Sequence, residues 1–226
     1  QQGHNYGCFQ DTIRDNLKGS HDVKDNVLST EKGFIQGAGS ASTDKMIALG
    51  LLSSNKNLKT TYGAGDYQAF TAQPTETVNY VPCHDNCTLW DKLIATSSSE
   101  TDRKKMVELA GAILLTAQGI PFIHSGCEMA RTKGYGESPV PSGFHNSNNN
   151  PDGMNKIDWA RKDTYFDLYK YYKGLIAMRK AHPMFRYSTW TDVSANAAVT
   201  GTMGSNFLVY DIQDKSDVDS WTEVLV

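Results

Sequence analysis

The chain has 226 residues, a formal net charge of −3, and 39% hydrophobic and 21% charged residues, which suits one large domain or one domain with part of another. The two signs of charge are interspersed without a polybasic block, which argues against nucleic acid and anionic membranes as partners. No run of 18 apolar residues occurs, so no segment is predicted to span a membrane. The composition therefore favours a neutral ligand.

The first part of the chain predicts two helices separated by a loop. Residues 9–18 carry apolar side chains four positions apart, and Gly19 follows them as a stop signal. Residues 20–42 are rich in Gly, Ser and Asp, which is typical of a loop. A second helix is predicted to begin at Thr43 and to end before the polar stretch SSNKN.

The middle of the chain predicts a strand, a helix and a second strand in succession. TVNYVPC (77–83) has the Val and Tyr content of a strand. Ser99 begins the clearest helical pattern, and Gly119 lies where a glycine commonly ends a helix. IPFIHSG (120–126) then forms a second short apolar run. Such a unit implies parallel strands joined by a right-handed crossover.

Both of these predicted strands end in polar side chains. His84 and Asp85 follow the first strand, and His124 and Ser125 close the second. In parallel α/β folds, ligands bind at the carboxyl ends of the strands. We therefore expect a binding site where these residues meet.

The remainder of the chain predicts a long loop, a helix and several short strands. Residues 134–156 are rich in Gly and Asn, and a loop of this length in a compact domain is usually functional or disordered. Residues 164–181 form a helical pattern that stops before Pro183, and β-like runs follow residue 186. One face of that helix is predicted to pack in the core through Tyr165, Leu168, Tyr169, Tyr172, Leu175 and Ile176.

The four cysteines do not predict a disulfide scaffold at this chain length. Cys83 and Cys87 bracket His84, but zinc sites usually have a tighter cysteine pair and a second pair of ligands. We therefore interpret these cysteines as free, partly buried thiols and predict no metal site.

VNYVPCHDNCTLWDKL resembles type I pullulanases and their debranching relatives in glycoside hydrolase family 13, the α-amylase family. The resemblance continues through LLTAQGIPFIHSGCEMARTKGYGE, NSNNNPDGMNKIDWARK and YKGLIAMRKAHPMFR. It also includes the earlier segments FQDTIRDNLKGS and KGFIQG. It thus covers nearly the whole chain in the expected order.

The resemblance implies an α/β fold made of the later strands and helices of a (β/α)8 TIM barrel, followed by the start of an all-β domain. Residues 1–186 would be the C-terminal portion of the catalytic barrel. Residues 77–83 would lead to the end of its seventh strand, and residues 120–126 would be its eighth strand. Residues 187–226 would be the truncated beginning of a C-terminal β-sandwich domain. The activity implied is retaining hydrolysis of α-1,6 linkages in pullulan, amylopectin or limit dextrins, for which two carboxyl groups lie about 5–5.5 Å apart.

Residue roles carried over from the resemblance centre on Asp85. It would accept hydrogen bonds from the 2- and 3-hydroxyls of a glucose ring and stabilise the transition state, and His84 would donate to the same hydroxyls.

In the long loop, Asn149, Asp152 and Asn155 match the family segment that lines substrate subsites. Trp90 is interpreted as packed in the barrel wall, with stacking on glucose as the alternative. Arg131 and Glu128 are either a structural ion pair or binding groups.

The nucleophile and general acid of the family belong to its fourth and fifth strands, and no matching motif occurs in this sequence. We therefore expect this chain alone to be inactive and to need the N-terminal half of the same barrel as its partner. Alternatives are another α-amylase-family enzyme (isoamylase, branching enzyme or α-amylase) and a non-catalytic glucan-binding fragment.

No cofactor is required by the resemblance. Some relatives carry calcium, but no carboxylate cluster here has the spacing of a calcium loop. The cellular location stays open, since polymer substrates favour a secreted or surface enzyme and unpaired thiols favour a reducing interior.

Overall fold

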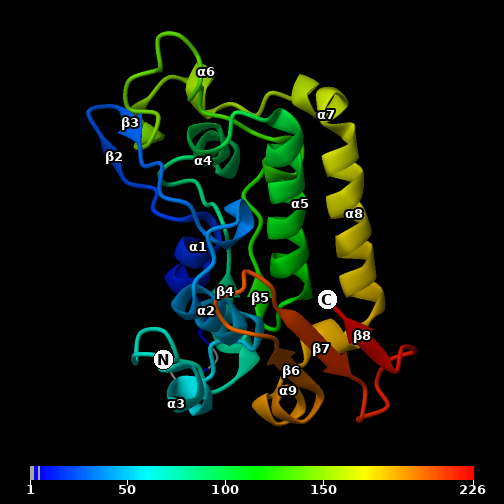
Figure 1. Ribbon diagram of the computed structural model, residues 1–226. Coiled ribbons are helices and arrows are strands. Elements are labelled where there is room, and N and C mark those ends of the chain that lie inside the picture. The colour runs from blue at the N-terminus through cyan, green and yellow to red at the C-terminus, as the bar shows by residue number, and fades with distance from the viewer. Residues whose placement is uncertain (1–2, 5) are drawn as a thin grey trace.

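A computed structural model describes residues 3–4 and 6–226. At its centre, three short parallel strands form a sheet in the order β1-β4-β5 (Figure 1). The register pairs Phe9 with Val78 and Val78 with Ile120. The strands of this sheet are β1 (Cys8–Phe9), β4 (Thr77–Asn79) and β5 (Ile120–Pro121).

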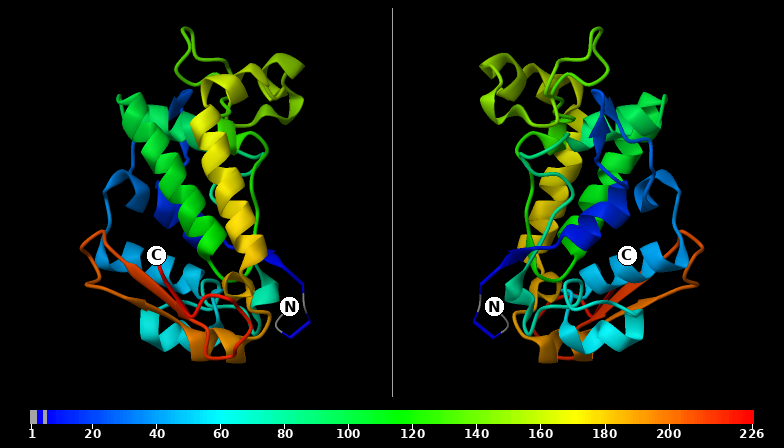
Figure 2. Two further views of the ribbon diagram at one scale, coloured as in Figure 1. Left: turned by 90° about the vertical axis from the view of Figure 1, so that its right-hand side faces the viewer. Right: turned by 90° about the vertical axis from the view of Figure 1, so that its left-hand side faces the viewer.

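Helices of very different lengths connect and cover this sheet (Figures 1 and 2). Two of them, α4 and α5, join β4 to β5, which confirms the predicted parallel strand–helix–strand order. None of the helices in the described part of the chain combines the length and apolar composition needed to cross a membrane. The α-helices are α1 (Asp11–Lys18), α2 (Ala41–Leu51), α3 (Lys59–Tyr62), α4 (Leu89–Thr96), α5 (Glu100–Thr116), α6 (Asp152–Asn155), α7 (Ala160–Thr164), α8 (Phe166–Ala181) and α9 (Trp190–Asn196).

The two predicted strands at 77–83 and 120–126 are correct in place but shorter than expected. Strand β4 ends at Asn79, although the buried chain continues through Tyr80 and Val81. Pro82 has no N–H to donate to a neighbouring strand. The segment beyond β4 therefore forms no further strand pairing before the turn at residue 84.

The interpretation of residues 20–42 as loop is wrong in part, because a hairpin lies within it. Strands β2 (Val23–Lys24) and β3 (Val27–Leu28) pair in antiparallel fashion. The two residues between them, Asp25 and Asn26, both have positive φ angles. That conformation closes a two-residue hairpin, and Asp and Asn adopt it more readily than most residues.

The long helices α5 and α8 lie side by side in both views of Figure 2. The side chain of Ser99 caps α5 as predicted, accepting a hydrogen bond from the Asp102 N–H at 3.2 Å. At the other end, the guanidinium of Arg179 in α8 donates to the carbonyls of Leu115, Ala117 and Gly119 at 2.7–3.0 Å. Leu115 lies in the last turn of α5, Ala117 is its C-cap and Gly119 follows it. The guanidinium therefore satisfies carbonyls at and just beyond the helix C-terminus, and the two helices are joined by polar as well as apolar contacts.

The predicted core face of the last helix is only partly correct. Tyr165, Leu168 and Tyr172 are buried, whereas Ile176 is 39% exposed. The tyrosine ring of Tyr172 lies against Gly111 of α5, where any larger residue would collide with it. Close approach of the two helices therefore buries Leu168 and Tyr172 in the first half of α8, and in its second half the buried side chain is that of Arg179.

The β-like runs after residue 186 are confirmed as an antiparallel sheet in the order β6-β7-β8. Helix α9, which precedes it, was not predicted. Tyr210 and Ile212 of this sheet belong to the same hydrophobic cluster as the helices, and Tyr210 Oη lies 3.2 Å from Gln118 Nε2. The strands are β6 (Ala197–Thr200), β7 (Val209–Gln213) and β8 (Glu223–Leu225).

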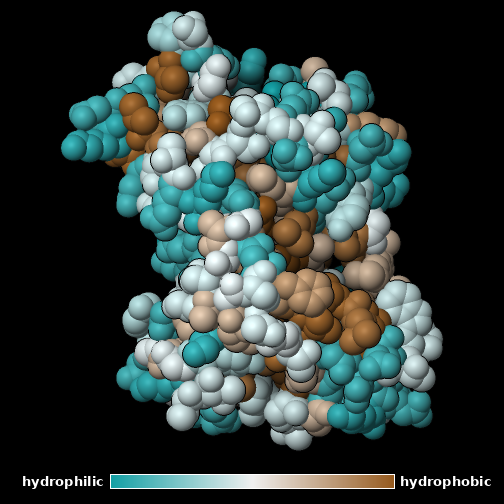
Figure 3. All heavy atoms as spheres, in the orientation of Figure 1, coloured by the Kyte–Doolittle hydropathy of each residue, from teal (hydrophilic) through white to brown (hydrophobic). Residues whose placement is uncertain are grey.

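Apolar residues also gather on the surface between α5 and this sheet (Figure 3). They surround a groove of about 260 Å³. Its lining includes Phe34, Ile113, Phe207, Leu208 and Val226.

The contact between Gly111 and Tyr172 predicts an unequal response to alanine in two neighbouring helices. A Cβ at Gly111 would lie 2.6 Å from Cζ of the buried Tyr172 ring, whose hydroxyl is tied to the Val107 carbonyl at 3.1 Å. We expect Gly111→Ala to lower the free energy of unfolding by about 1–3 kcal/mol, because overpacking strains the core. Urea unfolding followed by circular dichroism measures this.

The matched control is Gly174→Ala in α8, where an added Cβ meets no atom within 4 Å. That substitution should raise the free energy of unfolding by about 0.5–1 kcal/mol through helix propensity alone. Equal stabilisation by both substitutions would contradict the packing described here.

Candidate functional site

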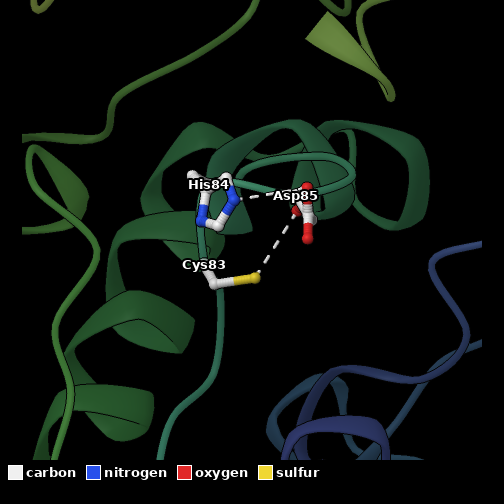
Figure 4. Close-up of side chains that lie close together, drawn as sticks. All are labelled: Cys83, His84 and Asp85. Carbon is white, nitrogen blue, oxygen red and sulfur yellow. Dashed lines mark hydrogen bonds and ion pairs between the residues drawn. The ribbon is translucent and has the colours of Figure 1, made fainter. Parts of the chain in front are cut away.

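The turn after β4 carries the predicted pair, His84 and Asp85. Their side chains are 82% and 68% exposed, and His84 Nε2 lies 3.4 Å from Asp85 Oδ1. Figure 4 shows them together with Cys83, whose thiol lies 3.9 Å from the Asp85 carbonyl oxygen. The buried residues Tyr80 and Val81 precede the turn, so a buried segment delivers polar side chains to the surface as the sequence predicted.

A buried lysine sets the shape of this turn. Lys133 Nζ donates to the carbonyls of His84 and Asn86, both at 2.7 Å. The Lys133 side chain comes from the segment after β5, and the residue is 2% exposed. Asn86 itself has a φ of 62°, a conformation that costs free energy for a residue with a side chain. The lysine therefore stabilises a backbone shape that the chain would not favour by itself.

Asp91 holds the same region from the other side. Its carboxylate accepts hydrogen bonds from the backbone N–H of Thr88 at 3.3 Å and of Lys133 at 3.0 Å, and also from the hydroxyl of Thr132. The Thr88 hydroxyl in turn accepts from the Asp91 N–H, which completes a capping box at the start of α4. Burial raises the pKa of Asp91, although these hydrogen bonds oppose the increase.

His124 lies at the carboxyl end of β5 and is almost fully buried. Its Nε2 is 3.1 Å from Arg131 Nη1. Burial, together with the charges of Arg131, Lys133 and His84, lowers the pKa of His124 to about 4. The imidazole is therefore neutral at pH 7, and its Nε2 accepts from the guanidinium. Ser125, predicted beside it, is exposed and offers its carbonyl to the same Arg131.

Arg131 joins the end of β5 to the asparagine-rich loop. Besides its contact with His124, it donates from Nη2 to the Asn155 carbonyl at 2.6 Å. It is not paired with Glu128, since no ion pair connects the two in the described chain and Glu128 accepts instead from the Gly126 N–H. Arg131 is thus a support for the loop, and a structural ion pair with Glu128 was a wrong alternative.

The three loop residues that were predicted to bind substrate differ in their surroundings. Asn155 uses its amide within the loop, donating to the carbonyls of Ser147 at 2.6 Å and Asn150 at 3.0 Å. Asn149 and Asp152 are exposed. Within residues 6–226, no hydrogen bond or ion pair joins any of the three directly to His84 or Asp85. Arg131 and Lys133 provide the connection between the loop and the turn.

A cavity of about 490 Å³ lies between the loop and the segment after β5. Arg131 and Lys133 line it from one side, and Met154, Lys156 and Arg161 line it from the loop and the start of α7. The cavity therefore adjoins the groups that hold the His84–Asp85 turn.

Trp90 is buried beneath the site, with its ring centroid 5.0 Å from that of Tyr165. This confirms the interpretation as a packing residue. All four cysteines carry free thiols, and Cys87 is buried against Leu28 and Phe144. The thiols therefore form no disulfide scaffold, as predicted.

Sequence reasoning missed the residues that support the site. The signal for Asp91 was present, because Thr88 and Asp91 have the spacing of a capping box at the start of a helix. No local pattern distinguished Lys133, whose partners lie 47 and 49 positions away.

The role of Lys133 predicts a local loosening in the variant Lys133→Met. Two buried carbonyls would lose their donor, so we expect a decrease of about 1–3 kcal/mol in the free energy of unfolding. Amide hydrogen exchange at residues 84–88 should become faster. Lys156→Met is the control, since Lys156 lines the same cavity but is exposed. Unchanged exchange at 84–88 in Lys133→Met would refute the role.

The lowered pKa of His124 predicts a pH-dependent stability. The folded protein holds this imidazole neutral to about pH 4, whereas an unfolded histidine titrates near pH 6.5, at about its usual value. The unfolded chain therefore binds the extra proton as pH falls from about 6.5 towards 4, and the stabilising contribution present above pH 6.5 is lost over that window.

Urea unfolding measured between pH 4 and 7 checks this expectation. His124→Gln should show a shallower loss of stability on acidification than the unmodified chain, and the exposed-residue control His4→Gln should keep the original slope. The same dependence of unfolding free energy on pH in His124→Gln and in the unmodified chain would contradict this expectation.

No protein-family model matches the chain. Pullulanase of Bacillus subtilis (strain 168) is 34% identical over 222 residues, which is 97% of this chain and 28% of that protein. Pullulanase from Bacillus acidopullulyticus superimposes with a TM-score of 0.81 and 34% identity, over 100% of this chain and 25% of that one.

A further solved structure, of Paenibacillus barengoltzii pullulanase in complex with maltohexaose and α-cyclodextrin, matches with a TM-score of 0.79 and 33% identity. It covers 97% of this chain and 31% of that one. This chain therefore spans about a quarter to a third of the length of these relatives. Over nearly all of its own length, it is homologous to pullulanases.

Proposed function

We propose that this chain is part of a retaining α-glucan debranching hydrolase that cleaves α-1,6 linkages. In this proposal, β1, β4 and β5 are consecutive strands of a (β/α)8 barrel within residues 1–186, and residues 187–226 begin a C-terminal β domain. Two features support it: the parallel order β1-β4-β5 with intervening helices, and homology to pullulanases at 34% identity.

The observation that carries the proposal is the exposed His84–Asp85 pair at the carboxyl end of a parallel strand. A carboxylate that projects into solvent from a turn whose backbone is held by hydrogen bonds can accept two hydroxyl hydrogen bonds from one sugar ring. Asp85 would do so at the 2- and 3-hydroxyls and stabilise the oxocarbenium-like transition state. His84 would donate to the same hydroxyl pair.

The ligand is proposed to be a neutral α-glucan. The maltohexaose bound to the P. barengoltzii relative supports this class, and the chain's net charge of −3 does not favour a polyanion. The exposed Asn149 and Asp152 would contact outlying glucose units. Asn155, tied into its loop through its amide, would act mainly by holding the loop.

The sheet also supports a partner in the form of further barrel strands. In the described residues, β1 and β5 are the edges of the sheet, and such edges pair readily with other strands. Phe9 is 52% exposed, although its ring lies 4.9 Å from that of Tyr80 and 5.3 Å from that of Phe122. We propose that this aromatic face packs against the N-terminal half of the same barrel, which would carry the nucleophile and general acid.

A chimaera tests the function. Residues 1–226 would replace the homologous segment of B. subtilis pullulanase, and release of reducing sugar from pullulan would be measured. We expect an active chimaera that loses activity on the order of 10²–10³-fold in kcat with Asp85→Ala, because one preorganised group facing developing charge is worth about that much. Asp163→Ala, in the exposed helix α7, is the control that should keep full activity.

The chain alone should release no reducing sugar. If the isolated chain hydrolyses pullulan and Asp85→Ala abolishes that hydrolysis, the assignment of the nucleophile and general acid to a different segment is refuted. A chimaera that is folded and binds maltotriose but is inactive would favour a glucan-binding function. A preference for linear amylose over pullulan would favour an α-1,4-specific relative.

A further inference from the structure

The described residues contain one group of His, Cys, Asp or Glu side chains whose donor atoms could share a metal ion, and it coincides with the proposed sugar site. Cys83, His84 and Asp85 each offer one donor atom, and these atoms all lie within 4.8 Å of one another. Figure 4 shows the three side chains converging on the same side of the turn. His84 and Asp85 are exposed and Cys83 is partly exposed, so an ion has direct access.

We propose that Cys83, His84 and Asp85 form a binding site for a thiophilic divalent cation such as Zn²⁺. A thiolate, an imidazole nitrogen and a carboxylate oxygen are the three types of protein ligand that Zn²⁺ takes, and three of them with water in the fourth position complete a tetrahedral site. Bonds of about 2.0–2.3 Å place such ligands roughly 3.3–3.8 Å apart. The His84–Asp85 separation of 3.4 Å already lies in that range, and rotation of the Cys83 side chain can close the rest.

The surroundings fix the backbone of the turn that carries the three ligands. Lys133 Nζ holds the carbonyl of His84 within the turn, and its charge acts on Asp85. A Cys83 thiolate and the Asp85 carboxylate would together neutralise the charge of a divalent ion, and the Lys133 ammonium is already bonded to two backbone carbonyls.

The structure also explains why the sequence predicted no metal here. Cys87, the second cysteine of the apparent pair, is buried against Leu28 and Phe144 and cannot share the ion. Asp85 takes its place as the third ligand. Calcium does not fit, because it needs six to eight oxygen ligands and this group supplies one carboxylate and a thiol.

The consequence for activity rests on the proposed function. The same His84 and Asp85 that would bind glucose hydroxyls would be occupied by the cation. Zn²⁺ and an α-glucan should therefore exclude each other, and Zn²⁺ should act as an inhibitor competitive with the sugar.

Metal binding can be tested directly on the 226-residue chain without any sugar. Co²⁺ serves as a spectroscopic probe, since a thiolate ligand gives it a near-ultraviolet charge-transfer band, and Zn²⁺ should bleach that band by displacement. We expect the band in the unmodified chain and in Cys8→Ser, which removes a partly exposed thiol elsewhere. It should be absent in Cys83→Ser, and Asp85→Asn should weaken Zn²⁺ affinity by at least about tenfold, or 1.4 kcal/mol.

Circular dichroism establishes that each variant is folded before titration. A folded unmodified chain without the band, or a band that survives Cys83→Ser, would overturn the metal site.

Maltotriose added to the Co²⁺-loaded chain then separates the two proposals. Loss of the band supports a shared site, whereas a persistent band together with measured maltotriose binding elsewhere overturns the overlap. A Co²⁺ site in a chain that binds no maltotriose would count against the proposed function alone.

Discussion

Donation from buried or half-buried cations to backbone carbonyls is the interaction on which this structure depends. Its parallel strands are two or three residues long, so much of the buried backbone near the site lies outside regular ladders and needs other partners. Lys133 serves the turn at His84, Arg131 serves the loop at Asn155, and Arg179 serves the end of α5. Lys92 does the same for the segment after the β2–β3 hairpin, donating to the Ser29 carbonyl at 2.6 Å.

In each of these contacts, the carbonyl acceptors compensate the cation for its lost hydration. A buried ammonium or guanidinium loses hydration, which lowers the pKa of Lys133 and brings that of Arg179 to about 10. Each remains compensated only while its carbonyl partners stay in place, since an unpaired buried charge is far more costly than a paired one. The irregular segments and the cations therefore stabilise one another. Such mutual dependence gives a strand-end turn a definite shape without regular secondary structure.

The shape of the His84–Asp85 turn determines which side-chain atoms are available to a ligand. His84 and Asp85 can be exposed and still well placed because the constraint acts on their backbone, through Lys133 and the Asp91 capping box, and leaves their side chains open to solvent. A sugar hydroxyl and a metal ion both require donor atoms that are accessible and preorganised. The same arrangement therefore suits both ligands considered for this turn.

Local pattern determined much of what was predicted correctly. Apolar periodicity located α1, α5 and α8, and β-branched residues located β4 and the C-terminal strands, because these signals depend on neighbours within a few positions. The polar ending of the strand before His84 identified the candidate pair for the same reason. The hairpin within 20–42 was missed, since its Asp25–Asn26 turn is a weaker signal than one containing glycine.

Only the tertiary structure decided which side chains support the site. A backbone carbonyl occurs at every position, so the sequence cannot indicate that Lys133 selects those of His84 and Asn86. It likewise could not show that Cys87 is buried while Cys83 faces the same side as His84 and Asp85. The sequence by itself determined the residue types at the strand end, and the packing of distant segments determined their geometry, because long-range contacts leave no periodic trace in the chain.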